Sequence, residues 1–289
     1  MSDSYLDTEI ENRSAQAGNI GQLLLDAGKL NPQQAEQTLL YQREQGVKFG
    51  LAAVALGFIE EKDIAEVLSF QFAYPYLIKG QSALDPKLIA AYEPFSSQVE
   101  SLRSLRTQLM LRWFSQGNKL AMFAGFESKI GCSATVANLG IVFSQLGERT
   151  LIIDGNLRQP HQHTLFGKDN ERGLTDILIQ RASTDCVQKI ESLRGLYLLT
   201  AGTAAPNPQE LLARPQLLRT LKTLQLDYDV VLIDSAPLSE SSDAQLLAKL
   251  ARGTVLVCQK NHSKMRNAEK LHEAMKMTGS ELLGVILTE

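Results

Sequence analysis

The fold is decided by residues 120–135, which read LAMFAGFESKIGCSAT. An apolar run, Leu120–Ala124, leads into a loop that opens at Gly125 and closes at Gly131, and a stretch of helical character follows. A buried strand, a glycine-bearing loop and a helix start together form a phosphate cradle, because backbone N–H groups and the helix amino end attract anions. We therefore expect a phosphate-binding loop here, followed by a helix from Ala134 onward.

The end of this loop departs from the Walker A pattern, which closes on Gly-Lys-Ser or Gly-Lys-Thr. Cys132 stands where the phosphate-contacting lysine belongs, while Ser133 keeps the hydroxyl that binds Mg²⁺. Lys129 offers a nearby ammonium that can turn toward phosphates. A thiol at a helix start is sometimes reactive, but a small space-filling side chain is the simpler interpretation of Cys132. The predicted nucleotide contacts are Gly125, Lys129, Gly131, Cys132, Ser133 and Ala134.

Short apolar runs alternate with stretches of helical length through the carboxyl-terminal part of the chain. Such charge-free runs suit strands that are buried on both faces of a parallel sheet. The expected fold class is therefore α/β, with a doubly wound, mainly parallel sheet of the P-loop type. The expected strands are Leu120–Ala124, Thr150–Ile153, Leu196–Ala201, Val230–Ile233, Thr254–Cys258 and Gly284–Leu287.

Two of these strands end in aspartate. Residues 151–160 read LIIDGNLRQP and residues 230–237 read VVLIDSAP, the second matching a Walker B strand. Ligands of open α/β sheets bind at the carboxyl ends of the strands, so Asp154 and Asp234 should lie near the phosphate-binding loop.

The order and spacing of these motifs, with PNPQELL at 206–212 between the two aspartates, resemble the bacterial tyrosine kinases of exopolysaccharide and capsule systems. In that family the pieces read roughly GEGKS, LLIDxDLRxP, GxxPNPxELL and VLIDxxP, and the resemblance spans residues 100–289. It implies ATP or ADP with Mg²⁺ as the cofactor, Asp154 and Asp234 as catalytic residues, and Ser133, Asp154 and Asp234 as ligands of Mg²⁺. It also implies a cytoplasmic protein recruited to the inner face of the membrane, whose partner is a Wzz-like chain-length determinant or other exopolysaccharide machinery.

A charged segment upstream adds to this resemblance. Glu100, Arg103 and Arg106 fit the family's ExxRxxR element, which implies contacts between the subunits of a homo-oligomer. Their spacing places the three side chains near one face of a helix, a pattern that is also typical of a solvated charged face.

Two substitutions bear on whether the site is catalytic. The family lysine is replaced by Cys132, and the second aspartate of LLIDxD is replaced by Asn156. Removing charge stabilisation from a transition state typically costs ~100- to 1000-fold in rate.

The last tyrosine is Tyr228, so this sequence shows no tyrosine-rich tail to phosphorylate. We predict a pseudokinase regulator, with an active autokinase as the alternative. A MinD- or ParA-type positioning ATPase is a third candidate, although those proteins keep lysines that are absent here, one of them at the position of Glu127.

The amino-terminal part contains a repeat at an offset of 29 residues, in which NIGQLLLDAGKL (19–30) matches KFGLAAVALGFI (48–59). Each copy reads as a short helix, a glycine at Gly28 or Gly57 that permits a positive φ, and a second helix, so we expect a small all-α domain. Asn31 before Pro32 should cap the second helix.

This repeat resembles the amino-terminal domain of type II secretion and MSHA-pilus assembly ATPases, some of which bind cyclic di-GMP. The leading arginines of that family are replaced by asparagine and lysine, which lack the planar fork that arginine offers to guanine. Cyclic di-GMP binding and a structural or docking role therefore both stay open. The residues implied as cyclic di-GMP contacts are Asn19, Gly21, Leu25, Gly28, Gln42, Lys48, Gly50, Val54, Gly57 and Gln71.

Composition excludes some functions and supports this division of the chain. The net charge of -3 provides no basic surplus, so we expect no nucleic-acid polymer as partner. No apolar run approaches the ~20 residues that span a bilayer, and the polar start of the chain does not read as a secretory signal. The three cysteines lie far apart, as in cytoplasmic proteins. The expected segments are a polar leader (1–17), the two-repeat domain (18–80), a proline-bearing linker (81–97) and the P-loop domain (98–289).

Overall fold

A computed structural model describes residues 20–61, 63–64, 67, 77 and 82–289. The chain divides into two compact units, Met1–Pro75 and Tyr76–Glu289. The predicted leader, and the predicted ligand contacts Asn19 and Gln71, lie outside the described residues.

The amino-terminal unit is helical where the structure describes it. Its helices are α2 (Ile20–Asp26), α3 (Pro32–Gln45) and α4 (Phe49–Ala55). Asn31 caps α3 as predicted, because its Oδ1 accepts the Gln34 N–H at 2.8 Å and the Gln34 side chain accepts the Asn31 N–H at 3.0 Å. Gly28 and Gly57 end the first helix of each repeat with φ values of 68° and 71°, a conformation that glycine adopts at low cost. The two repeats therefore share the same turn.

The repeat glycines in α2 and α4 have a packing role. A Cβ atom at Gly21 would lie 3.2 Å from the Phe49 ring, and one at Gly50 would lie 2.9 Å from Cδ1 of Ile64. These contacts belong to a small hydrophobic core that contains Leu24, Leu30, Ala35, Phe49, Ala53, Ile59 and Val67. The identity of both glycines thus follows from helix packing, without a ligand.

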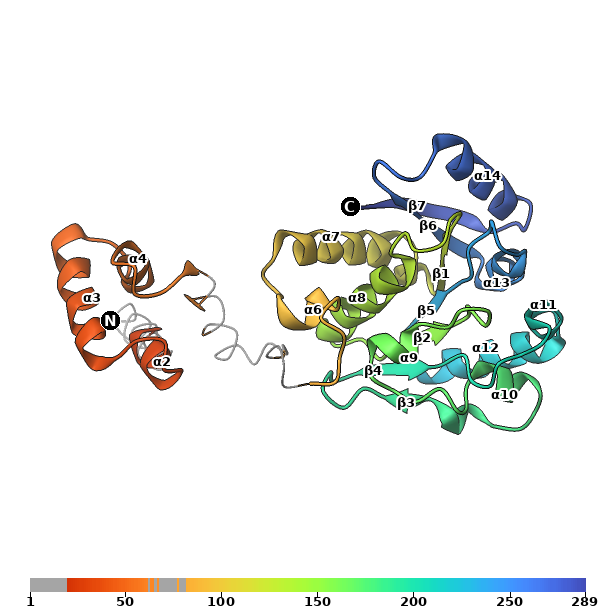
Figure 1. The fold of residues 1–289 in the computed structure, drawn as a ribbon, viewed down its shortest axis with the longest axis horizontal. Coiled ribbons are helices and arrows are strands. Elements are labelled where there is room, and N and C mark those ends of the chain that lie inside the picture. The colour runs from red at the N-terminus through yellow and green to blue at the C-terminus, as the bar shows by residue number, and fades with distance from the viewer. Residues whose placement is uncertain (1–19, 62, 65–66, 68–76, 78–81) are drawn as a thin grey trace, which may run out of the picture. The chain divides into compact units, whose positions relative to one another are not determined.

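The carboxyl-terminal unit is built on a seven-stranded sheet in the order β3-β4-β2-β5-β1-β6-β7 (Figure 1). The strands are β1 (Leu120–Gly125), β2 (Thr150–Asp154), β3 (Gln188–Lys189), β4 (Leu196–Leu199), β5 (Val230–Asp234), β6 (Gly253–Gln259) and β7 (Glu281–Thr288). All neighbours are parallel except β3 and β4. The predicted α/β class is confirmed, and every expected strand forms. The short edge strand β3 was not predicted, because two polar residues carry no hydrophobic pattern.

Helices cover both faces of the sheet, and each layer encloses its own hydrophobic core (Figure 1). On one face lie α6 (Ile89–Tyr92), α7 (Ser97–Arg112), the 3₁₀ turn η1 (Phe114–Gln116), α8 (Cys132–Gln145) and α9 (Gln162–Leu165). On the other lie α10 (Leu174–Leu178), α11 (Pro208–Leu212), α12 (Pro215–Asp227), α13 (Asp243–Ala251) and α14 (Met265–Lys276), with the 3₁₀ turn η2 (Thr184–Cys186) nearby.

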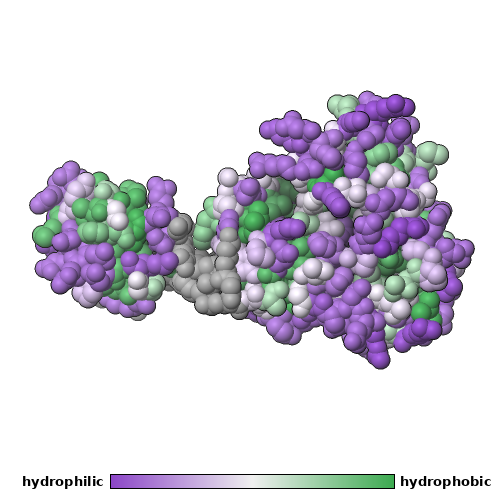
Figure 2. Space-filling view, in the orientation of Figure 1, coloured by the Kyte–Doolittle hydropathy of each residue, from purple (hydrophilic) through white to green (hydrophobic). Residues whose placement is uncertain are grey.

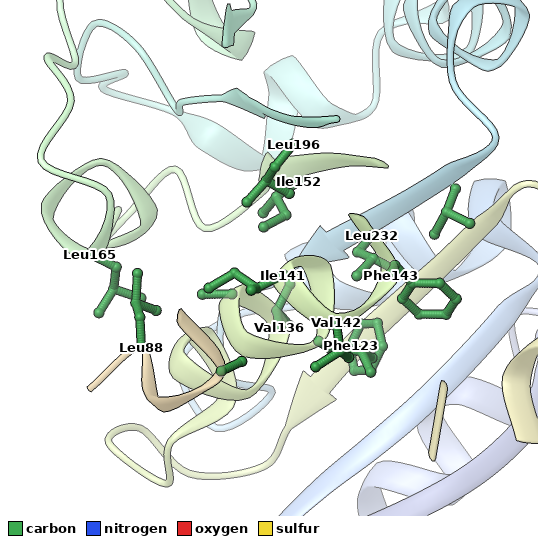
Figure 3. Packing of buried hydrophobic residues seen from close by; sticks show 14 of the residues in the cluster. Leu88, Phe123, Val136, Ile141, Val142, Phe143, Ile152, Leu165, Leu196 and Leu232 are labelled. Atoms are coloured by element: carbon green, nitrogen blue, oxygen red, sulfur yellow. The ribbon is translucent and has the colours of Figure 1, made fainter. Parts of the chain in front are cut away.

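Helix α8 is the central element of the first layer, with every side chain from Val136 to Ser144 buried. Figure 3 shows its apolar residues packed against side chains of β1, β2, β4 and β5. The approach is close, because a Cβ atom at Gly140 would lie 2.5 Å from Cδ1 of Ile152. This packing fixes the amino end of α8 at the carboxyl end of β1, where the predicted phosphate cradle lies.

The predicted linker, residues 81–97, is part of the folded carboxyl-terminal unit over its described residues. Its buried side chains include Leu84, Leu88, Ala90, Ala91 and Tyr92, all within the α8-side core. Pro86 and Pro94, which suggested a linker, instead lie in turns on either side of α6, where a residue with fixed φ is suited. This segment positions one wall of the candidate site.

Hydrophilic residues cover most of the visible surface of the carboxyl-terminal unit (Figure 2). Within the described part of the chain, none of the helices combines the length and the apolar character that crossing a bilayer requires.

Candidate functional site

The loop after β1 has the backbone of a phosphate cradle. Gly131 adopts φ of 81° immediately before α8, which starts at Cys132, two residues earlier than predicted. The first N–H groups of α8 have no partner within the helix, so they are available to an anion. A side chain at Gly125 would clash with Ile130, which explains the glycine at the loop entrance. Lys129 adopts φ of 61° and is exposed.

The back of the loop is tied to the carboxyl-terminal elements. The Thr288 hydroxyl donates to the Ile130 carbonyl at 2.8 Å. The Glu127 carboxylate accepts the Asn267 side-chain amide at 2.7 Å and the Ser263 hydroxyl at 3.2 Å. These bonds link the loop to β7 and to the start of α14.

All six predicted loop contacts line one cavity of about 610 Å³. The cavity is lined by Lys87, Gly125, Glu127, Ser128, Lys129, Ile130, Gly131, Cys132, Ser133, Ala134, Asn156, Gln159, Pro160, His161, Ser235 and Pro237. Three segments far apart in the sequence therefore meet the phosphate-binding loop here: the turn before α6, the residues after β2 and the residues after β5.

The two predicted aspartates lie side by side at the carboxyl ends of β2 and β5. Asp154 and Asp234 are register partners, and both are fully or almost fully buried. Asp154 accepts three backbone N–H groups, from Asn156 at 3.2 Å and from His161 and Gln162 at 2.9 Å each. The turn after β2 is thus folded around this carboxylate.

Gln162 joins the aspartates to the loop, a role that its sequence context did not indicate. Its side-chain amide donates to Oδ2 of Asp234 at 2.8 Å and to the Ser133 carbonyl at 3.0 Å. The residue is completely buried. A glutamine in a polar stretch reads as a surface residue, and only the tertiary packing of α9 against α8 places it inside.

Burial and mutual repulsion set the protonation of the carboxylate pair. Burial raises the pKa of Asp154 to about 8, and the charge of Asp234 adds to the shift, although the three N–H donors oppose it. Burial also raises the pKa of Asp234, against hydrogen bonds from Ser133 and Gln162. The pair therefore holds a proton near neutral pH when no cation is bound.

Cys132 has the properties of a neutral, space-filling thiol. Its pKa is raised well above the ordinary value by burial and, secondarily, by the charge and the hydrogen bond of Asp234. A thiolate is the reactive form of cysteine, so this environment disfavours reactivity.

The residues at the carboxyl ends of the strands fit a Mg²⁺ ion. Oδ1 of Asp234 is buried and accepts no hydrogen bond of regular geometry from a described residue, and Ser133 lies beside the same carboxylate. Within the described ranges there is no group of three or more His, Cys, Asp or Glu residues that could hold a metal alone. Mg²⁺ commonly uses one or two protein oxygens together with substrate phosphates and water, which matches this donor set.

The ExxRxxR residues lie on α7. Arg103 donates to Glu100 at 3.1 Å, and Arg106 donates to the Val142 carbonyl of α8 at 2.7 Å. Arg106 thus bonds within its own chain, and the subunit contact expected for this motif stays a prediction.

Besides Asp154, residues that were not predicted as ligands also fix the turn after β2. The Asn156 side chain accepts the Gln159 N–H at 3.1 Å. Arg158 pairs with the buried Asp243 of α13 at 2.7 Å. Asn156 therefore lines the cavity as a structural amide at the place where relatives are expected to have a second aspartate.

Comparisons with known proteins bear on the family. No protein-family model matches the chain. Over 206 residues the chain is 34% identical to the tyrosine-protein kinase YwqD of Bacillus subtilis, covering 71% of this chain and 87% of YwqD. It is 31% identical over 201 residues to the tyrosine-protein kinase Wzc of Salmonella typhi, covering 70% of this chain and 28% of that protein.

Solved structures give the same result. The kinase domain of the Escherichia coli tyrosine kinase ETK matches with a TM-score of 0.69 and 27% identity, covering 73% of this chain and 82% of that one. The chimerical protein CapA2B2 matches with a TM-score of 0.66 and 31% identity, covering 77% and 97%. MinD from Pyrococcus horikoshii, at 23% identity and a TM-score of 0.50, shares the fold alone.

Proposed function

The chain belongs to the family of bacterial tyrosine-protein kinases, and from that premise we propose that it is a nucleotide-binding regulator whose phosphoryl transfer is slow or lost. The observation that carries the proposal is Cys132, which stands in place of the lysine at the start of α8 while the rest of the cradle keeps its geometry.

Retention of the cradle supports nucleotide binding. Gly131 keeps the left-handed conformation, and Ser133 and the two aspartates lie at the same edge of the sheet. We propose that Ser133 and Asp234 hold Mg²⁺ and that Asp154 supports the ion from beside them. When bound, this ion would neutralise charge on the nucleotide phosphates.

Loss of charge supports the regulatory role. The neutral thiol of Cys132 contributes no cation to the phosphates. Asn156 cannot act as a base, and its side-chain oxygen is already used by the Gln159 N–H. Phosphoryl transfer depends mainly on positioning and charge neutralisation, so both changes lower the rate while leaving the main-chain contacts in place.

A paired measurement tests this proposal. We expect wild-type protein to bind Mg²⁺–ADP and to hydrolyse ATP at least ~100-fold more slowly than the Cys132→Lys/Asn156→Asp variant, because one lost charge contact is typically of that size. Asp234→Asn serves as the control that removes the metal ligand. Robust tyrosine phosphorylation by the wild type that disappears in Asp234→Asn would instead establish an active autokinase.

We further propose that the protein acts in exopolysaccharide or capsule synthesis, at a membrane chain-length determinant to which it is recruited from the cytoplasm. The support is family membership, together with relatives such as the Salmonella Wzc kinase. Co-purification with a candidate chain-length protein, in the presence and absence of nucleotide, tests this partner.

The amino-terminal unit is proposed to carry the regulatory input, with cyclic di-GMP as the candidate ligand. The support is the repeat itself, whose two turns have the same backbone conformation. Lys48 is exposed at the start of α4, where a ligand can reach it. Isothermal titration with cyclic di-GMP is the test, and absence of heat at tens of micromolar ligand would leave a structural or docking role.

A further inference from the structure

A turn outside the phosphate-binding loop brings another lysine to the same cavity. Residues 85–88 form this turn, in which the Leu88 N–H donates to the Asp85 carbonyl at 2.9 Å. Lys87 lines the cavity together with Cys132 and Ser133. Its side chain is exposed and forms no ion pair with another described residue. The ammonium is therefore available to a ligand.

The start of the turn is fixed to α9. The Asp85 N–H donates to the Leu165 carbonyl at 2.8 Å, and the Asp85 carboxylate accepts the Lys87 N–H at 2.8 Å. Leu88 is fully buried, and Figure 3 shows it beside Leu165 in the core. The residues on both sides of Lys87 are thus held by the interior of the unit.

The end of the turn is fixed to α8, the helix whose amino end forms the cradle. Asn138 of α8 donates its side-chain amide to the Lys87 carbonyl at 3.0 Å and accepts the Ala90 N–H at 2.8 Å. Asn138 is only 5% exposed, so water does not compete well for these bonds. The backbone of Lys87 is consequently bonded to α8, the helix whose first N–H groups are available to an anion.

The charged residues that line the cavity include few cations that could contact a bound phosphate. Lys87 and Lys129 are the two lysines among the lining residues. Glu127, which also lines it, already accepts hydrogen bonds from Ser263 and Asn267. Oδ1 of Asp234 is buried beside Ser133 and accepts no hydrogen bond of regular geometry from a described residue, which suits a metal ligand, and a metal in a phosphate cradle accompanies a polyphosphate.

We infer that Lys87 is a phosphate-contacting residue of this site and supplies, from outside the loop, the cation that Cys132 does not. The inference rests on the proposed function, because it requires that the site binds a nucleoside di- or triphosphate. A lysine suits the role, since a point charge on a flexible stem needs no fixed orientation to reach a phosphate oxygen. Lys129 belongs to the loop itself, whereas Lys87 is held by buried contacts on a separate element.

The test is the affinity of the full chain for a fluorescent ADP analogue with Mg²⁺. We expect Lys87→Met to weaken binding about tenfold or more, as for loss of a hydrogen bond to a charged group. Lys87→Arg should retain most of the affinity. Lys222→Met is the matched control, because Lys222 is an exposed lysine of α12 that does not line the cavity. Melting temperatures of all variants should agree, since both lysine side chains are exposed.

The same substitution can also be measured in a second protein, the Cys132→Lys variant. In Cys132→Lys protein the loop has its own cation, so Lys87→Met should lose much less affinity there than in the wild type. Wild-type binding that Lys87→Met leaves unchanged, or that only Lys129→Met weakens, overturns this inference while the proposed function stands. Equal weakening by Lys222→Met also overturns it, because the effect would then be one of net charge. Absence of nucleotide binding by the wild type defeats the proposed function and this inference together.

Discussion

Replacing Asp154 by asparagine should reduce the pH dependence of folding stability in the nucleotide-free protein, leaving the part that Asp234 contributes. A raised pKa means that the folded state binds the proton more tightly than the unfolded chain does. This stabilisation is complete below the ordinary pKa of 3.8 and is lost as the pH rises toward about 8. Without a cation, wild-type protein should therefore become less stable between those limits.

The expected magnitude follows from the same shift. One proton contributes up to about 1.4 kcal/mol per pH unit. A shift from 3.8 to about 8 corresponds to roughly 6 kcal/mol across the whole window, as an order of magnitude. Since domains are stable by about 5–15 kcal/mol, such a change is easily measured.

Urea unfolding followed by circular dichroism, in EDTA at several pH values from 5 to 8, provides the assay. Asp154→Asn also loses acceptors for backbone N–H groups, so its absolute stability should fall, and only the slope with pH decides. Asp176→Asn is the matched control. Burial tends to raise the pKa of Asp176, but bonds from Thr203 and Gly173 lower it overall, so it stays ionised throughout this window. Equal slopes in the wild type and in Asp154→Asn would refute the reasoning.

Three further predictions concern packing, capping and charge. Gly140→Ala should destabilise the carboxyl-terminal unit by about 1–3 kcal/mol in urea unfolding, because the new methyl group would overlap Ile152. Asn31→Ala removes the cap of α3 and should cost about 1 kcal/mol, while Asn31→Ser should restore most of it, as followed by helical signal on heating. Arg158→Ala leaves the buried carboxylate of Asp243 without its partially exposed partner and should lower stability by about 1–3 kcal/mol, a loss that Arg158→Ala/Asp243→Ala should reduce in a double-mutant cycle.

The features that could be predicted from the sequence are those with a local cause. Runs such as 230–233 are short, apolar and free of charge, which only a strand buried on both faces explains well. The glycine at 131 is required by a left-handed backbone, and Asn31 by the unpaired N–H groups of α3. Asp154 and Asp234 could be placed together because parallel strands end at one edge of the sheet.

The features that were missed depend on contacts between distant segments. Gln162 is polar, yet it is buried because α9 packs on α8, and its sequence neighbours give no sign of this. The segment around Lys87 carries prolines and no helical period, so it was expected to be a linker. Its role in the site comes from Asn138, which lies about 50 residues further along the chain and bonds it to α8.

The carboxylate of Glu127 links the phosphate-binding loop to residues near the start of α14. Because the carboxylate accepts hydrogen bonds from Asn267 and Ser263, a shift of the start of α14 would be felt by the loop that lines the cavity. A lysine at this position would form no such link, since an ammonium cannot accept these bonds. Glu127 thus couples the position of the phosphate-binding loop to that of the start of α14.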